Sequence, residues 1–278
     1  MVADEVVHHI ANALNGLPGI VGIVLGGSRA RGNHGPNSDI DIGIYYDMSL
    51  GFNIEDINRI ASKLDDEQRE GLVTSIGGWG PWVNAGGWLV VQGYHVDLIL
   101  RDINRVSQVV GDCITGEVST HYHTGHPHGF LNVMYMGEIS ICKVLSDPKR
   151  QIAQLKSKTT PYPEALKNAL IGYFGFEAAF SLQHAISNVY KDDSSYVAGC
   201  CFRTISCLNQ VLFAKNEQYC VNEKKAVALV NDFLIAPKDY KSRIDQVITL
   251  LSVHEESTRQ GVDILRQLVQ ETETLIDQ

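Results

Sequence analysis

The chain has 278 residues, 44% of them hydrophobic, and a formal net charge of −9 at pH 7. This length suits one large domain or two small ones, and the apolar fraction is sufficient for a folded core. The acidic balance disfavours sequence-independent binding to long nucleic acids, which requires a broad cationic surface, whereas it would attract a cationic small substrate.

No run of 18 apolar residues occurs, so we expect no transmembrane helix and no membrane partner. The first residues, Met1–Glu5, are acidic and lack the basic region of a signal peptide. The six cysteines are scattered without a Cys-x-x-Cys pair. This pattern favours reduced, buried thiols over disulfides or structural zinc, and we expect a cytoplasmic protein.

The first predicted elements lead into a glycine-serine turn. Residues 3–15 have the apolar spacing of a helix, and residues 20–25 form an apolar run typical of a buried strand. The turn Gly26-Gly27-Ser28 follows, with backbone N–H groups and a hydroxyl that suit phosphate oxygens. A short helix is expected to begin at Ser28, with its N-terminus toward the phosphates. Arg29 and Arg31 flank the turn, and each could pair with phosphate or lie exposed at the helix start.

Two aspartates lie at the start of the next predicted strand, Ile40–Tyr46: one directly before it and one at its second position. Asp39 and Asp41 are two residues apart, so in a strand both carboxylates lie on one face while Ile40 points toward a core. Adjacent carboxylates in an apolar strand repel one another and lose hydration, which a divalent cation between them would compensate. Phosphate-binding turn and paired carboxylates together indicate nucleoside triphosphate chemistry.

A helix over 54–70, a loop over 77–82 and a hairpin of strands 88–92 and 94–100 come next. The second strand of the hairpin carries Asp97 among apolar residues, a candidate third carboxylate that could alternatively face solvent. Three tryptophans lie between the second and third carboxylates: Trp79, Trp82 and Trp88. They could stack on a base or an aglycone, or plug the sheet edge as packed hydrophobic groups. These elements predict a small mixed sheet with helices packed on it.

After Asp102 the pattern becomes helical almost throughout. Helices are predicted over residues 103–115, 130–145, 148–157, 163–190, 196–218, 223–233, 238–252 and 256–275. We therefore predict an α+β domain over 1–145 and an all-α helical-bundle domain over 146–278. The bundle is expected to wall the substrate cleft and to hold part of a homodimer interface.

A histidine-rich segment, His121–His128, interrupts this helical region with four of the ten histidines. Three roles are open for it: capping or packing in a structured loop, contact of His126 or His128 with substrate or phosphate, and zinc binding. The segment lacks a histidine pair at i and i+4, and Pro127 would splay the neighbouring rings, so zinc is the least favoured role.

The order of motifs resembles the polymerase-β-like nucleotidyltransferase superfamily. The carrying residues are Gly27-Ser28, Asp39-x-Asp41 and, on a later strand, Asp97. The longer form, Gly-Ser-x-Ala-Arg-Gly with Ser-Asp-Ile-Asp, is similar to the branch with aminoglycoside and lincosamide nucleotidyltransferases and MNT-type antitoxins. The motif match covers residues 20–100.

This resemblance implies a nucleotidyltransferase fold over the first domain and transfer of a nucleoside monophosphate, AMP from ATP, to a hydroxyl of a small-molecule acceptor. Two Mg²⁺ ions would be held by Asp39, Asp41 and Asp97, with Asp97 as either second-site ligand or general base. Gly27, Ser28 and Arg31 would hold the triphosphate. An antibiotic acceptor fits the nearest branch, but a different natural acceptor is equally open.

Two alternatives remain. In the first, the acceptor is a protein or a tRNA end, as in MNT-type antitoxins, although those are usually short single domains and here a helical part is fused. In the second, the protein binds nucleotide without catalysis. An intact set of three carboxylates argues against the second alternative, because unused carboxylates in a strand only cost desolvation.

Overall fold

The protein is described from a computed structural model that covers residues 3–277. The chain divides into two compact units: unit 1 comprises Met1–Gly111 and Tyr135–Pro161, and unit 2 comprises Asp112–Met134 and Tyr162–Gln278. Compactness does not show which parts fold alone, so the separate domains 1–145 and 146–278 stay a prediction. The predicted fold class is confirmed: a mixed α+β region with a small sheet precedes a helical region.

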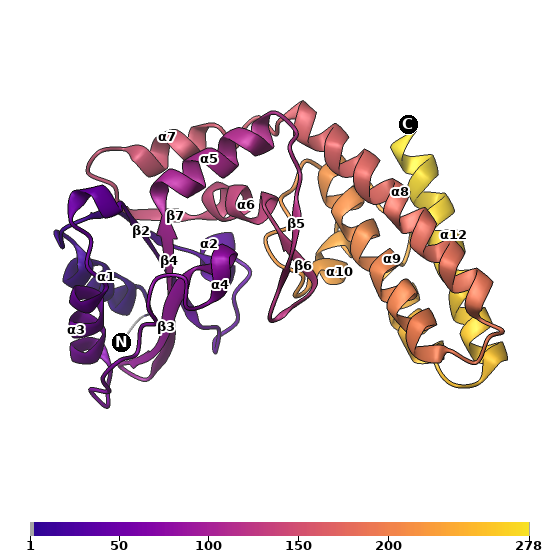
Figure 1. Cartoon of the computed structure of the whole chain (residues 1–278), viewed down its shortest axis with the longest axis horizontal. Coiled ribbons are helices and arrows are strands. Elements are labelled where there is room, and N and C mark those ends of the chain that lie inside the picture. Colours follow the sequence, from indigo (N-terminus) through magenta and orange to yellow (C-terminus); the bar gives the residue numbers. More distant parts are fainter. Residues whose placement is uncertain (1–2, 278) are drawn as a thin grey trace. The chain divides into compact units, whose positions relative to one another are not determined.

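Unit 1 holds one sheet and the helices around it (Figure 1). Its strands are β1 (Ile20–Leu25), β2 (Ile40–Tyr46), β3 (Ala85–Val91), β4 (Tyr94–Asp102) and β7 (Lys143–Ser146). Its helices are α1 (Ala3–Leu14), α2 (Gly27–Arg31), the 3-10 turn η1 (Met48–Leu50), α3 (Ile54–Leu64), α4 (Gly80–Val83) and α7 (Gln151–Ser157). The chain passes between the units three times: within α5 (Ile103–Ile114), within α6 (Val133–Ile141) and after Pro161.

The five strands lie in the order β3-β4-β2-β1-β7, with β2 and β4 parallel and the other neighbours antiparallel. One face of the sheet is the core, where Ile40, Ile42 and Ile44 of β2 are fully buried in a cluster that also holds apolar residues of α1 and α3. The alternating residues Asp41 and Gly43 are only half-buried on the opposite face. The alternation of strand side chains therefore separates a packed face from a face that can hold a site.

Helix α3 ends at Leu64, before the predicted end at residue 70, because Asp65 leaves the helix to pair elsewhere. Its buried carboxylate accepts hydrogen bonds from the backbone N–H of Val90 in β3 and from the Arg69 guanidinium. The neighbouring Asp66 accepts from the N–H groups of Gln92 and Gly93, which form the β3–β4 turn. These two aspartates anchor the hairpin to the helix end.

Unit 2 is mainly helical. Its helices are α8 (Glu164–Asn188), α9 (Ser194–Lys215), α10 (Ala226–Asn231), α11 (Tyr240–Leu250) and α12 (Glu255–Ile276). Helices α8 and α9 form a long antiparallel hairpin, with α12 packed beside it (Figure 1). By length and composition alone α9 could cross a membrane, but 67% of its apolar window is buried inside the structure, as in a core helix.

The histidine-rich segment forms a two-stranded hairpin of β5 (Thr120–His123) and β6 (His126–Leu131). The sequence predicts a structured loop here and a helix from residue 130, so both strands are a correction. Pairing between Thr120 and Leu131 and between His123 and His126 builds the hairpin around a turn at Gly125. A segment this polar shows no alternation of apolar residues from which a strand could be predicted.

Candidate active site

The glycine-serine turn joins β1 to α2 in unit 1. Gly26 caps the helix, and its N–H donates to the backbone oxygen of Asp41 at 2.8 Å. Helix α2 begins at Gly27, one residue before the predicted start. The first N–H groups of a helix have no acceptor within the helix, so those of Gly27 and Ser28 are available to an anion.

Asp41 lies directly against this turn. Gly27 has a φ of +56°, and a Cβ added there would lie 1.8 Å from Oδ2 of Asp41. Only glycine therefore permits this backbone conformation with the carboxylate in place. The absence of a side chain at Gly27 therefore lets the turn and the Asp41 carboxylate lie in contact.

Asp97 is the register partner of Asp41 on the neighbouring parallel strand. Partners in register point to the same face of a sheet, with their strands about 4.8 Å apart. Both carboxylates are half-buried on the face opposite the core. The two side chains therefore form an adjacent pair across β2 and β4.

The donor set fits a hard divalent cation, because two neighbouring carboxylates supply oxygen ligands and charge next to the turn. Asp39, the third predicted ligand, lies exposed just before β2 begins. Within residues 3–277, no three His, Cys, Asp or Glu side chains are grouped so that they could hold a metal ion. The three aspartates are thus a pair with a nearby third member, and the expected three-ligand group is not preassembled.

Arg29 positions Asp39, a role that the sequence did not indicate. Its guanidinium is buried and donates to the backbone oxygens of Ser38, at 2.6 Å, and Asp39, at 3.0 Å. The same group lies 6.0 Å from the ring centre of Tyr94. Arg29 is therefore engaged inside the protein and fixes the chain before β2. Arg31, the predicted phosphate ligand, is half-buried in the last turn of α2.

Two of the three tryptophans meet on the sheet face that carries the carboxylates. The ring centres of Trp79 and Trp88 are 4.8 Å apart at an interplanar angle of 32°. Trp82 instead packs under Arg105, whose guanidinium lies 4.5 Å from the ring centre, and on Tyr135. The tryptophans thus divide into a pair on the open face and a third, packed residue.

In unit 2, His128 is only 4% exposed and its ring lies 5.9 Å from that of Phe174. Neither ring nitrogen has a hydrogen-bond partner among the described residues. Burial, and then the nearby Arg203, lowers the pKa of His128 to about 4, so the ring is neutral at pH 7. His126 lies beside Phe130, with ring centres 5.3 Å apart. The structure gives both histidines packing contacts, and their expected contact with substrate stays a prediction.

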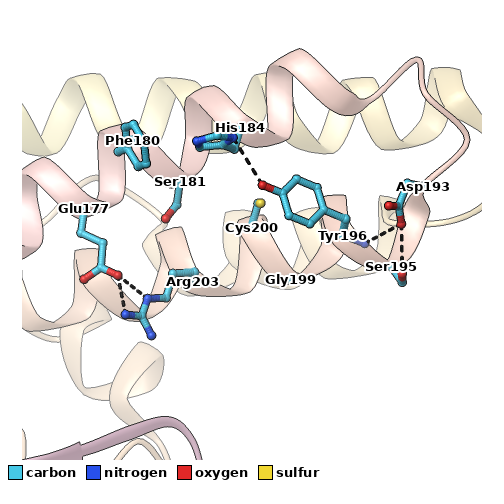
Figure 2. Close-up of a pocket in the computed structure, with 10 residues that line it drawn as sticks. All are labelled: Glu177, Phe180, Ser181, His184, Asp193, Ser195, Tyr196, Gly199, Cys200 and Arg203. Carbon is cyan, nitrogen blue, oxygen red and sulfur yellow. Dashed lines mark hydrogen bonds and ion pairs between the residues drawn. The ribbon is translucent and has the colours of Figure 1, made fainter. Parts of the chain in front are cut away.

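Unit 2 also contains a pocket of about 730 Å³ between α8 and α9, shown in Figure 2. Its lining residues are Glu177, Phe180, Ser181, His184, Asp193, Ser195, Tyr196, Gly199, Cys200 and Arg203. Figure 2 shows most of its polar groups paired with one another: Arg203 with Glu177, and Tyr196 with His184 at 3.3 Å. One carboxylate oxygen of Glu177, Oε2, is buried without a hydrogen-bond partner. The pocket contains none of the residues predicted for the site.

Comparison with known proteins identifies the class of one segment of unit 1. Residues 8–76 match the family model described as a nucleotidyltransferase domain. The matched segment includes the glycine-serine turn, Asp39 and Asp41, and it ends before Asp97. This domain supports nucleotidyl transfer as the general activity.

A nucleotidyltransferase-like protein from Exiguobacterium sibiricum, known from a crystal structure, is similar with 11% identity and a TM-score of 0.43 over 99% of this chain and 78% of that chain. No curated protein matches the chain. The narrower resemblance to aminoglycoside and lincosamide enzymes stays a prediction.

Proposed function

We propose that the protein is a metal-dependent nucleotidyltransferase that moves AMP from ATP to a hydroxyl group of a small-molecule acceptor. The observation that carries this proposal is the register pairing of Asp41 with Asp97, with Asp41 seated against the Gly27 turn. The turn and the carboxylates lie next to one another on one open sheet face. A nucleoside triphosphate with a bound divalent cation requires both, because its phosphates need donors and its cation needs oxygen ligands.

The residues of the candidate site would divide into two groups in this reaction, one for the phosphates and one for the metal. The N–H groups of Gly27 and Ser28 and the Ser28 hydroxyl would bind the β- and γ-phosphates, joined by Arg31. Asp39, Asp41 and Asp97 would hold Mg²⁺, which supplies stabilisation of negative charge on the phosphate oxygens. Asp97 has a second open role, as acceptor of the proton from the attacking hydroxyl.

The test measures binding and turnover separately. We expect the non-hydrolysable analogue α,β-methylene-ATP to bind more tightly with Mg²⁺ than without it. Asp41→Asn should abolish this difference, and it should abolish pyrophosphate release from ATP. Asp56→Asn is the control, because Asp56 lies on α3 and pairs with the exposed Arg59. Equal affinity with and without Mg²⁺ in the unsubstituted protein, measured by calorimetry, would contradict the proposal.

Asp97→Asn distinguishes the enzyme from a nucleotide-binding protein. Transfer should fall by about 10²–10⁴-fold, the usual value of a general base, while the analogue still binds. Pyrophosphate release is measured with a panel of hydroxyl compounds that includes aminoglycosides and lincosamides. Labelling of protein or RNA, with every small acceptor inert, would instead favour a macromolecular acceptor.

A further inference from the structure

The tryptophan pair Trp79–Trp88 is the part of the open sheet face that the proposed chemistry leaves unexplained. Trp88 is 64% exposed although it stands in the middle of β3. Indole is a large apolar group, and leaving it in water forgoes the stabilisation that burial provides. A hydrophobic plug would be covered, so the exposure of Trp88 points to a surface that receives a ligand.

The neighbouring glycine makes room for this pair. A Cβ added to Gly86 would lie 2.2 Å from the ring atom Cζ3 of Trp79. Gly86 and Trp88 are two residues apart and therefore share a sheet face, so the Trp79 ring packs against the glycine and beside Trp88. The pair is held in place by the strand and by a close approach that only glycine allows.

The pair belongs to the same row of residues as the carboxylates. Trp88 is the antiparallel register partner of Asp97, and Asp97 is the parallel partner of Asp41. The row continues to the turn, where the N–H of Gly26 donates to the backbone oxygen of Asp41. Across the sheet the order is thus tryptophan, carboxylate, carboxylate, phosphate-binding turn, with about 4.8 Å between strands.

In-line transfer gives this order a chemical meaning. The acceptor oxygen forms a bond to the α-phosphorus while the bond from that phosphorus to the bridging oxygen breaks. Pyrophosphate leaves with the electron pair, and a carboxylate or solvent takes up the hydroxyl proton. Attacking and leaving oxygens must lie on opposite sides of the α-phosphorus. With the leaving phosphates at the turn and the α-phosphorus over the carboxylates, the attacking oxygen comes from the side of Trp88.

We propose that the Trp79–Trp88 pair is the acceptor subsite, and that the acceptor is a hydroxyl compound with a flat ring face that stacks on the indoles. This inference rests on the proposed nucleotidyl transfer, because the in-line argument requires the triphosphate at the turn. It assigns the specificity for the acceptor to two residues outside the motif that binds nucleotide.

The test labels the protein with 5-fluorotryptophan and follows the ¹⁹F NMR signals of its three tryptophans, assigned by single Trp→Phe substitutions. With α,β-methylene-ATP and Mg²⁺ bound, tryptophol (a flat ring with a hydroxyl) is titrated, and glycerol serves as the acyclic comparison. We expect tryptophol, but not glycerol, to shift the signals of Trp79 and Trp88. Trp88→Ala should weaken tryptophol binding about tenfold, the usual loss when stacking on an aromatic side chain is removed. Its affinity for the ATP analogue should change less than about twofold.

Met48→Ala is the matched control, because Met48 is another exposed apolar residue of unit 1 and lies in η1. Equal weakening of tryptophol and of the ATP analogue by Trp88→Ala would overturn the inference, since the pair would then hold the nucleotide base. Absence of tryptophol-induced shifts, or binding that Trp88→Ala leaves intact, would also overturn it. If the ATP analogue fails to bind in a Mg²⁺-dependent way, the proposed function fails first, and the in-line argument fails with it.

Discussion

Some side chains around the candidate site form hydrogen bonds with the backbone and hold it in place. Arg29 is the clearest example, because its guanidinium binds the consecutive carbonyl oxygens of Ser38 and Asp39. Charged hydrogen bonds of this kind typically contribute about 1.5–3 kcal/mol each. Its place beside the turn left two roles open, pairing with phosphate or exposure at the helix start, whereas its structural partners depend on how residues 33–39 fold back. That path cannot be read from the local sequence.

Replacement of Arg29 should therefore uncouple metal binding from nucleotide binding. We expect Arg29→Ala to lower the free energy of unfolding by about 2 kcal/mol and to reduce the gain in affinity that Mg²⁺ gives the ATP analogue. In both properties Arg29→Lys should lie between the unsubstituted protein and Arg29→Ala, because a lysine supplies charge without the planar guanidinium. Calorimetry and urea unfolding measure the two effects. The control is Arg59→Ala, because Arg59 is an exposed arginine of α3; an equal effect there would show that Arg29 has no specific role.

Because His128 is buried, we expect the free energy of unfolding to fall in mild acid. Its folded pKa is about 4, below the ordinary value near 6.5, because the buried ring resists protonation. Between these two values the unfolded chain binds a proton that the folded chain does not, so stability falls as pH falls. From pH 7 to pH 5 this group should remove about 2 kcal/mol from the free energy of unfolding.

Urea unfolding at the two pH values measures this effect. His128→Leu should flatten the dependence by that amount, whereas His9→Leu, at an exposed position of α1, should leave it unchanged. If His128→Leu keeps the full dependence on pH, another group is responsible for it.

At the scale of elements, the end of α3 and the start of the β3–β4 hairpin are one unit joined by Asp65. The hydrogen bonds from Arg69, and then that from the N–H of Val90, hold the pKa of Asp65 well below its usual range. We expect Asp65→Ala to cost about 2–3 kcal/mol in urea unfolding, since the N–H of Val90 loses its acceptor. Asp56→Ala breaks the ion pair of α3 with the exposed Arg59 and should cost less than about 1 kcal/mol. Similar costs for the two substitutions would show that the hydrogen bonds of Asp65 stabilise the fold no more than a surface ion pair does.

Elements with a clear apolar pattern of their own are predicted well from sequence. Strands β1 and β2 have the predicted bounds, and α1, α5, α8 and α12 begin and end within two residues of them. Strand β7 is different, because Lys143–Ser146 has no pattern of its own and becomes a strand only by pairing with β1. The sequence predicts a helix there instead, which is wrong for this reason. Local periodicity carries no information about such a distant partner.

The candidate site shows the same limit. The turn and the two strand aspartates follow from spacing, and their placement on one sheet face agrees with the expected alternation. The contacts of Gly27 with Asp41 and of Trp79 with Gly86 join residues from different elements, and the spacing of residues along the chain does not predict such contacts. Both contacts occur at glycines, so a glycine in a strand or turn near a predicted site is a signal for close approach.

At the scale of the whole molecule, the sheet of unit 1 is completed by a segment that returns after residue 134. Strand β7 covers the outer edge of β1, and α7 packs on the same strand. Ile152 of α7 is fully buried, and a Cβ added to Gly22 of β1 would lie 2.6 Å from its Cγ1. The matched family segment, residues 8–76, therefore lacks two elements that its first strand needs.

This arrangement predicts where the chain can be shortened. A chain that ends after Pro161 should retain a cooperative unfolding transition and Mg²⁺-dependent binding of the ATP analogue. A chain that ends after Gly111 should lose both, because an uncovered β1 exposes unpaired backbone groups and an apolar face that favour aggregation. In the full-length chain, Ile152→Ala should cost about 2–4 kcal/mol in urea unfolding, from lost burial and the cavity that remains. Circular dichroism and calorimetry compare the two shortened chains. Equal unfolding midpoints for them would mean that β7 and α7 are accessory, and that the sheet is stable as the four strands β3-β4-β2-β1 alone.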